Sequence, residues 1–271
     1  MPTIRDAFDR LRRCQRAALI PFVMGGDPHP GLTGPLLLAL QDAGADLVEV
    51  GIPFSDPLAD GPVIQAASSR ALAHGTTPAG VLAAIASVRR RLRIPVVCLS
   101  YWNPVTQFGG HGGRGSPRAF VRAARESGCA GLIVPDLPVE EGGALREATT
   151  CEGIAAIFLA APTSPPARLR AIARASQGFI YYVSVAGTTG ARQSLPPGLA
   201  QGLRQVKLVT TKPVCVGFGI STPAQVAAVA RIADGAIVGS ALIRTMASTR
   251  GRAASVRAAA RFVARLRRAA G

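Results

Sequence analysis

The sequence predicts a (β/α)8 (TIM) barrel formed by a single domain over residues 1–271. Short apolar runs recur at fairly even intervals, and segments rich in Ala, Leu and Arg separate them. Strands that alternate with helices form a parallel sheet, and eight such units close into a barrel of about 250 residues. An open doubly wound sheet is the alternative, but no Gly-x-Gly-x-x-Gly pattern follows the first apolar run.

Each predicted strand is one of these apolar runs. In chain order they are Leu19–Val23, Leu47–Val50, Val96–Leu99, Gly131–Val134, Ala155–Leu159, Phe179–Val183, Val214–Gly217 and Ala236–Val238. The stretches between them are predicted as helices, and Pro78–Arg91, Pro117–Ser127 and Pro166–Ala175 begin with proline, whose missing N–H costs nothing at that position. The last helix, within Arg250–Arg268, is basic, with arginines at helical spacing opposite an apolar face.

Three carboxylates gather around the end of the second strand. Glu49 lies near its C-terminal end, and Asp56 and Asp60 follow in a loop. The prolines of this loop prevent a continuous helix or strand, and they are Pro53, Pro57 and Pro62. Because barrels place their functional groups at the C-terminal ends of strands and in the loops that follow, we expect the active site here.

Glycines follow the last strands of the predicted barrel. Gly217 ends the seventh strand and Gly219 follows it, while Gly239 and Ser240 come after the eighth. Glycine allows close approach of the backbone to a ligand, and N–H groups at a helix start favour an anion. This region therefore predicts a phosphate site, although turn glycines alone would explain each motif. The long segment 187–197 after the sixth strand is predicted to be a lid.

The formal net charge of +16 is placed unevenly along the chain. From residue 153 onward there are 16 basic residues and one acid, Asp234. A basic surface can bind nucleic acid without sequence preference. However, these arginines are scattered between elements, and the dense run in Arg250–Arg268 has only Phe262 as an interleaved aromatic. We therefore favour a solvated face and expect no nucleic-acid partner.

The cysteines, the histidines and the lengths of the apolar runs predict a cytoplasmic protein that binds no metal. The five cysteines are odd in number and contain no C-x-x-C, which indicates reduced thiols. The three histidines show no metal-ligand spacing. No apolar run approaches the length of a membrane span, and the basic N-terminal stretch lacks the pattern of a signal peptide.

The motifs together resemble the α subunit of tryptophan synthase over most of the chain. They are Ile20–Pro28, Glu49–Pro62, Val134–Pro138, Ala161–Ser164, Tyr181–Ser184, Gly187–Gly190, Val216–Ser221 and Gly239–Ser240. The resemblance implies a lyase of tryptophan biosynthesis that cleaves indole-3-glycerol phosphate to indole and glyceraldehyde 3-phosphate by a retro-aldol reaction.

The resemblance also implies a role for each site residue. Glu49 would move protons between indole C3 and the adjacent hydroxyl, Asp60 would accept the indole N–H, and Tyr181 would support them. The implied indole contacts are Phe22, Ile64, Leu99 and Tyr101, with Thr189 bonding Asp60 when the lid closes. The implied phosphate contacts are Gly190, Phe218, Gly219, Gly239 and Ser240.

By the same resemblance the protein has no cofactor of its own and pairs with a β subunit that uses pyridoxal phosphate, as an αββα tetramer. Pro53, Asp56 and Pro57 would contact that subunit. Three alternatives stay open at this point: a stand-alone indole-releasing lyase, another phosphate-binding barrel isomerase or epimerase, and an inert barrel that acts as an allosteric or nucleic-acid-binding partner.

Overall fold

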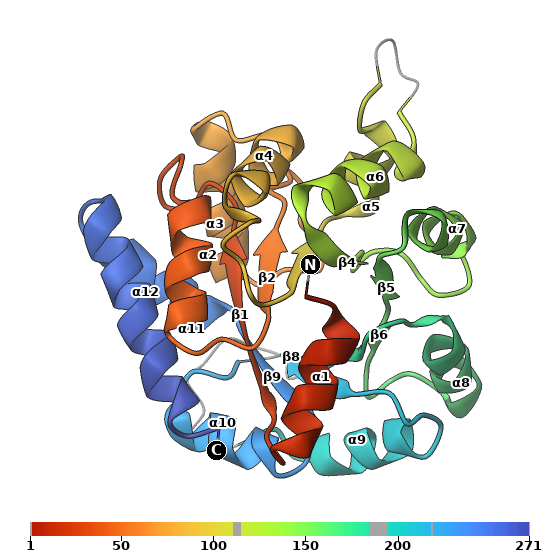
Figure 1. Ribbon diagram of the computed structural model, residues 1–271. Helices are drawn as coiled ribbons and strands as arrows, with labels where there is room; N and C mark the ends of the chain where they lie inside the picture. The colour runs from red at the N-terminus through yellow and green to blue at the C-terminus, as the bar shows by residue number, and fades with distance from the viewer. Residues whose placement is uncertain (1, 111–114, 185–194, 218, 271) are drawn as a thin grey trace.

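Strands and helices alternate along most of the chain (Figure 1). The structure, a computed structural model, describes residues 2–110, 115–184, 195–217 and 219–270. The strands in these residues are β1 (Ala18–Met24), β2 (Val48–Gly51), β3 (Val96–Leu99), β4 (Cys129–Ile133), β5 (Ala155–Ile157), β6 (Leu159–Ala160), β7 (Ile180–Val183), β8 (Val214–Gly217) and β9 (Gly235–Val238). The helices are α1 (Ile4–Arg13), α2 (Thr33–Asp42), α3 (Pro62–Ala73), α4 (Pro78–Val88), α5 (Trp102–Gln107), α6 (Pro117–Ser127), α7 (Gly143–Glu152), α8 (Pro166–Ala175), α9 (Leu199–Lys207), α10 (Pro223–Ala230), α11 (Ser240–Ala247) and α12 (Arg252–Arg267).

The strands form one parallel sheet that returns to itself. Its order is β5-β4-β3-β2-β1-β9-β8-β7-β6. The two end strands, β5 and β6, are consecutive in the chain with only Phe158 between them. The chain itself therefore joins the two edges, and the predicted barrel is confirmed.

The fifth predicted strand, Ala155–Leu159, is interrupted where a continuous strand was expected. Before Phe158 the chain pairs with β4, with Ile157 opposite Ile133, and after it Leu159 pairs with Tyr181 of β7. The Phe158 N–H donates instead to the Ser176 hydroxyl at 3.3 Å. The strand changes partner at this residue, which apolar patterning cannot reveal because both halves are equally apolar.

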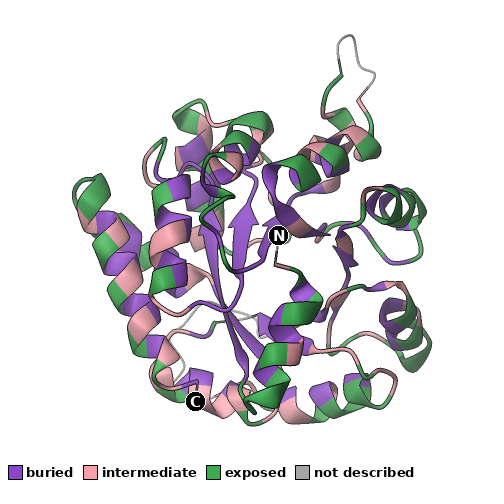
Figure 2. Cartoon of the chain, in the orientation of Figure 1, coloured by how far each residue is buried: buried purple, intermediate pink, exposed green. Residues whose placement is uncertain are grey.

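The helices cover the outside of the barrel (Figure 2). Strands β1, β2, β3, β8 and β9 are buried at every residue, whereas β4 to β7 each include partly buried residues. Three of the predicted helices begin at the expected proline, and in α4 and α6 the preceding Thr77 and Ser116 accept a first-turn N–H through their hydroxyls. These caps satisfy donors that the helix itself leaves unpaired. The proline signal therefore marked helix starts correctly.

Helix α1 closes the end of the barrel at which the strands begin. Its buried face includes Ile4 and Phe8. The Phe8 ring lies 5.9 Å from that of Phe179, just before β7, and a Cβ on Gly178 would come within 3.0 Å of Ile4. Glycine is required at position 178 because of this close packing and its φ of +74°.

Helix α12 is joined to the barrel through Asp46. This buried carboxylate accepts the Leu19 N–H at 2.9 Å and the Arg267 guanidinium at 2.8 Å. The outer arginines of α12 are exposed, as the amphipathic pattern predicts, and they are Arg257, Arg261, Arg265 and Arg268. The C-terminal helix is thus packed by its apolar face and fixed by one ion pair.

The cysteines of the chain are free, and three of them, Cys98, Cys129 and Cys215, are buried. Among the described residues no single helix is both long and apolar enough to cross a membrane. Helices α3 and α4 taken together are long and apolar enough, by length and composition only, but they are bent by 92° relative to each other.

We expect Asp46→Ala to lower the free energy of unfolding by about 3 kcal/mol, because it removes the carboxylate that a buried N–H and Arg267 share. Denaturant titration measures this loss. Asp42→Ala is the matched control, since the Asp42–Arg93 pair is two-thirds or more exposed on both sides, and it should cost less than about 1 kcal/mol. Equal losses in the two variants would contradict the anchoring role of Asp46.

Candidate active site

Three predicted site residues face the same interior of the barrel. In the parallel ladders Phe22 of β1 lies opposite Glu49 of β2, and Gly51 lies opposite Leu99 of β3. Residues two apart on a strand share a face, so Glu49 points to the same side as Leu99 and Phe22. The fold therefore brings one carboxyl group between two apolar side chains that are far apart in the sequence.

Glu49 is enclosed almost completely by the barrel, with 1% of its surface exposed. Neither of its carboxyl oxygens has a hydrogen-bond partner among the described residues. Burial, followed by the nearby charge of Asp60, raises the pKa of Glu49 from 4.5 to about 8. At neutral pH Glu49 therefore carries its proton.

The loop between β2 and α3, residues 52–61, is called the acidic loop because it contains Asp56 and Asp60. Side chains of α3 hold it in place. The Ser68 hydroxyl of α3 accepts the Phe54 N–H and donates to the Phe54 carbonyl, both at 2.8 Å. The Gln65 side chain donates to the Asp60 carbonyl at 2.9 Å. Arg70, also on α3, pairs with the buried Asp27 at 2.7 Å. The loop and α3 thus form one braced unit above the second strand.

Asp60 is half-buried at the end of this loop. Desolvation raises its pKa from 3.8 to about 6, and a hydrogen bond from the Tyr101 hydroxyl opposes the increase. The same hydroxyl accepts the Ala59 N–H at 2.9 Å. Asp60 is therefore ionised at neutral pH, whereas Glu49 is not.

Tyr181 lies on β7, across the barrel from Glu49. Its ring covers Gly217 of β8, where any Cβ would overlap the phenol. Burial and then the charges of Glu49 and Asp60 raise the pKa of Tyr181 well above its ordinary value. The hydroxyl is accordingly neutral and lies within the electrostatic reach of both carboxyl groups.

The apolar residues predicted to hold indole come from four elements. Phe22 and Leu99 are buried in β1 and β3, Tyr101 is buried just after β3, and Ile64 is half-buried in the first turn of α3. A Cβ at Gly51 would lie 2.8 Å from the Phe22 ring, and a Cβ at Gly239 would lie 3.3 Å from it. Phe22 therefore packs close to both the end of β2 and the start of α11.

The predicted phosphate region lies at the start of α11. Gly239 is the N-cap of this helix and forms no side-chain cap, so the first-turn N–H groups are left for another acceptor. Gly219 has φ of +58° and open space where a side chain would be. Most of the predicted lid 187–197 lies outside the described residues, and so do Thr189, Gly190 and Phe218. Residues 111–114, from a segment that is rich in glycine, also lie outside them.

The three predicted partner contacts differ in exposure. Asp56 is exposed and hydrogen-bonds the Ser55 hydroxyl, Pro57 is half-buried, and Pro53 is buried within the chain. Leu58 beside them is 91% exposed, the more exposed of two large apolar side chains at the described surface. Sequence analysis did not single out Leu58, although an apolar residue in a proline-rich polar loop is a usable signal.

Among the residues that the structure describes, no group of three or more His, Cys, Asp and Glu side chains could hold a metal ion.

Residues 8–270 match the tryptophan synthase alpha chain family. The chain belongs to this family. It is 48% identical to the alpha chain of Gloeobacter violaceus over 90% of its length and 87% of that protein's, and 49% identical to that of Prochlorococcus marinus over 91% and 87%. Members of the tryptophan synthase alpha chain family cleave indole-3-glycerol phosphate in tryptophan biosynthesis, so this chain is a lyase of that reaction.

Solved structures agree with this family assignment. The Legionella pneumophila alpha chain superposes with a TM-score of 0.88 at 35% identity, covering 99% of this chain and 97% of that one. The Mycobacterium tuberculosis tryptophan synthase in its aminoacrylate-bound form gives 0.86 at 33% identity, with 99% of each chain covered. The barrel is thus that of the tryptophan synthase alpha chains.

The raised pKa of Glu49 predicts how stability depends on pH. In the unfolded chain the carboxyl ionises above about 4.5, but in the folded chain it retains its proton up to about 8. Between pH 4.5 and about pH 8 the free energy of unfolding therefore falls as the pH rises, by on the order of 1 kcal/mol for each pH unit. Glu49→Gln, which resembles the protonated acid, should remove this loss.

Denaturant titrations of both proteins at pH 5 and pH 8 measure the effect. Glu49→Gln should gain stability over the parent chain at pH 8 but differ little at pH 5. The control Glu147→Gln, on the exposed face of α7, should change neither value. A pH-independent difference for Glu49→Gln would refute the protonated, desolvated state.

Proposed function

We propose that Glu49 and Asp60 divide the acid–base work of indole-3-glycerol phosphate cleavage. The observation that carries this assignment is the pair of carboxyl groups with pKa values of about 8 and about 6 at one end of the barrel. Two titratable groups whose environments separate their pKa values around neutral pH can act as acid and as anion at the same time.

In this proposal protonated Glu49 donates to C3 of the indole ring. Positive charge then develops on the ring nitrogen, and its N–H donates to the ionised Asp60. The Glu49 carboxylate next takes the proton of the side-chain hydroxyl beside the bond. The carbon–carbon bond breaks, its electrons return to the ring, and an aldehyde is released with indole. Glu49 ends the cycle protonated, as it began.

The other predicted residues complete this assignment. Tyr181 supplies a neutral hydroxyl within reach of both carboxyl groups. Phe22, Ile64, Leu99 and Tyr101 form apolar walls for a flat ring, and Thr189 bonds Asp60 on lid closure. Gly219, Gly239 and Ser240, with Gly190 and Phe218, bind the phosphate through backbone N–H groups and the dipole of α11.

We propose that the acidic loop docks on a β subunit that uses pyridoxal phosphate. The two subunits would form an αββα tetramer, and the assembly would be cytoplasmic. Support comes from Leu58 beside Asp56 and Pro57, since burial of a leucine side chain that is 91% exposed in the free chain would favour docking on a partner. Pro53, which is buried, would act by shaping the loop. The free cysteines are consistent with a reducing compartment.

Two alternative functions are weaker. A stand-alone indole-releasing lyase would use the same site, and the response to a β subunit distinguishes it. Another phosphate-binding isomerase would share the glycines near α11, but family membership and the Glu49–Asp60 pair both favour the lyase.

Glu49→Gln should lower the cleavage rate by about 100-fold or more, because the amide neither donates nor accepts the transferred proton.

Asp60→Asn should lower kcat while leaving the affinity for glycerol 3-phosphate nearly unchanged, because it removes only the counter-charge of the ring nitrogen. Glu147→Gln is the control. Steady-state kinetics with equilibrium binding decide this, and a Glu49→Gln enzyme with most of its turnover would overturn the assignment.

Cleavage by the isolated chain should rise tenfold or more when its cognate β subunit is added, a coupling of about 1.4 kcal/mol. Asp56→Arg and Leu58→Ser should each abolish this increase without loss of the basal rate. Leu208→Ser removes the other highly exposed leucine, which is 77% exposed at the end of α9, and should behave like the parent chain. High basal activity with no response to the β subunit would favour the stand-alone lyase.

A further inference from the structure

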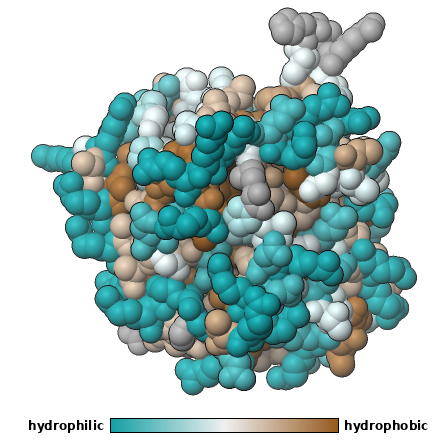
Figure 3. Space-filling view, viewed as in Figure 1, coloured by the Kyte–Doolittle hydropathy of each residue, from teal (hydrophilic) through white to brown (hydrophobic). Residues whose placement is uncertain are grey.

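A cleft of about 1020 Å³ lies at the end of the barrel opposite the acidic loop. One wall is α1, and the others are the segments that lead into the strands, including Ala17 before β1, Pro213 before β8 and Asp234 before β9. Hydrophilic side chains cover most of the face that α1 crosses (Figure 3). No residue of the acidic loop, α3 or α11 lines this cleft, so it is separate from the active site.

Three arginines from α1 and the residues after it line the cleft, and two of them, Arg5 and Arg16, are short of anionic partners. Arg5 and Arg12 are seven residues apart, about two helical turns, so they lie on one side of the helix, and Arg16 follows its end. Arg5 makes no ion pair or hydrogen bond among the described residues. Arg16 reaches Asp46 only at 4.0 Å, and the other oxygen of that carboxylate is already bound by Arg267 at 2.8 Å.

The segment before β8 also lines the cleft and holds an ammonium group in a fixed position. Lys212 Nζ donates to the carbonyls of Ala173 at 2.7 Å and Ser176 at 2.6 Å, at the C-terminal end of α8. An ammonium has three N–H donors, so one is left for a ligand. No carboxylate lies within 4.0 Å of it among the described residues, and burial lowers the pKa of Lys212.

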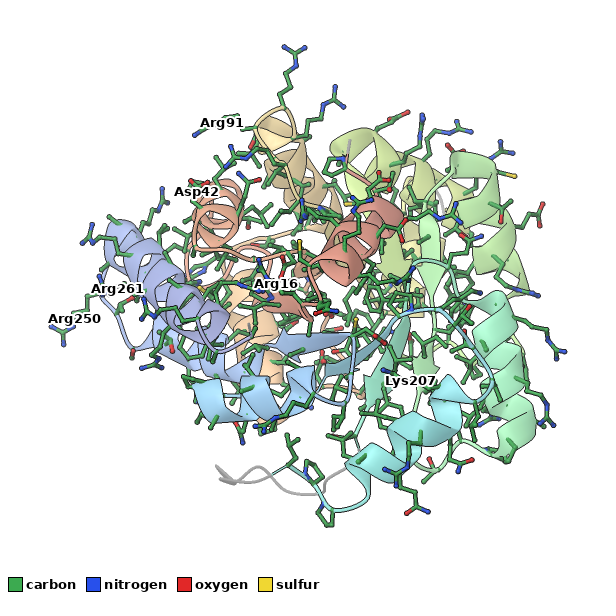
Figure 4. The ribbon with its side chains drawn as sticks, turned by 60° about the horizontal axis from the view of Figure 1, so that its bottom comes forward. Arg16, Asp42, Arg91, Lys207, Arg250 and Arg261 are labelled. Carbon is green, nitrogen blue, oxygen red and sulfur yellow. The ribbon has the colours of Figure 1, made fainter. Side chains whose placement is uncertain are left out.

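The acids that line the cleft are already paired. Asp9 contacts Arg12 at 3.5 Å, and Asp234 contacts Lys207 at 3.3 Å. Figure 4 shows Arg16 beyond the end of α1 and Lys207 at the end of α9. In the same view Arg261 points from α12 into solvent, and Arg250 does so from the segment before α12. The cleft therefore keeps a surplus of positive charge from Arg5, Arg16 and Lys212.

A favourable interaction with the helix dipole explains the position of Arg12 on α1 but not that of Arg5. Arg12 lies in the last turn of α1, where a cation favours the helix dipole. Arg5 lies in the first turn, where a cation opposes the dipole. An unpaired arginine at an unfavourable helix position, in a cleft that is also lined by the ammonium group of Lys212, favours an external anion.

We propose that this cleft binds a small molecule with two or more phosphate groups, with Arg5, Arg16 and Lys212 as its main contacts. One guanidinium group can bind two phosphate oxygens at once, and cations from both α1 and the segment before β8 suit an anion with more than one phosphate group. The side chains of Gln15, Gln177 and Thr211 also line it and offer hydrogen bonds to the rest of the ligand.

The test is titration calorimetry of the full chain with tripolyphosphate, with saturating glycerol 3-phosphate present to occupy the active site. We expect one tripolyphosphate per chain, and competition by ATP. Arg5→Glu should weaken binding at least tenfold. It should not lower the melting temperature, because an acid in the first helical turn is favourable. Lys212→Gln should weaken binding as well.

The matched control is Arg261→Glu, which makes the same charge change on the outer face of α12 and should alter the affinity less than twofold. Absence of saturable binding by the parent chain would overturn the proposal, as would equal weakening by Arg5→Glu and Arg261→Glu. Binding only to long single-stranded DNA, with affinity that grows with its length, would replace the small-molecule site by a nucleic-acid surface.

Discussion

The structure of the candidate active site depends on one constraint: a carboxyl group enclosed inside the barrel. Glu49 has no hydrogen-bond partner among the described residues, and an ionised carboxylate there would be very costly. The group therefore keeps its proton, and the barrel tolerates it as a neutral acid. Its environment makes Glu49 a proton donor at neutral pH and also makes it a source of instability as the pH rises.

In the proposed reaction, Asp60 can act beside Glu49 only if it stays close to Glu49 and is ionised while Glu49 is protonated. Asp60 lies on a loop, and loops are usually mobile. Here Ser68 and Gln65 of α3 bond the loop backbone, while Tyr101 bonds both the Ala59 N–H and the Asp60 carboxylate. Because α3 carries these contacts together with Ile64, one helix positions the anion and part of the apolar wall.

The excess positive charge has a structural distribution that composition does not reveal. The exposed arginines of α12 cover an outer face, and Arg12 and Lys207 favour the dipoles of the helices whose last turns they occupy. Arg5 fits neither pattern. The two ends of the barrel are therefore chemically different, with carboxyl groups of raised pKa at the ends of the strands and surplus cations where the strands begin.

The sequence alone determined the order of strands and helices, because apolar runs and helix-starting prolines are local signals. It also placed Glu49 at a strand end and Asp60 in the loop beyond it. Only the tertiary structure decided that the fifth strand changes partner at Phe158, that Pro53 is buried while Leu58 is exposed, and that the Tyr101 hydroxyl bonds the acidic loop. It also decided the protonation states, since burial and the distance between charges set a pKa. These properties depend on residues brought together from distant parts of the chain, and local patterns carry no information about them.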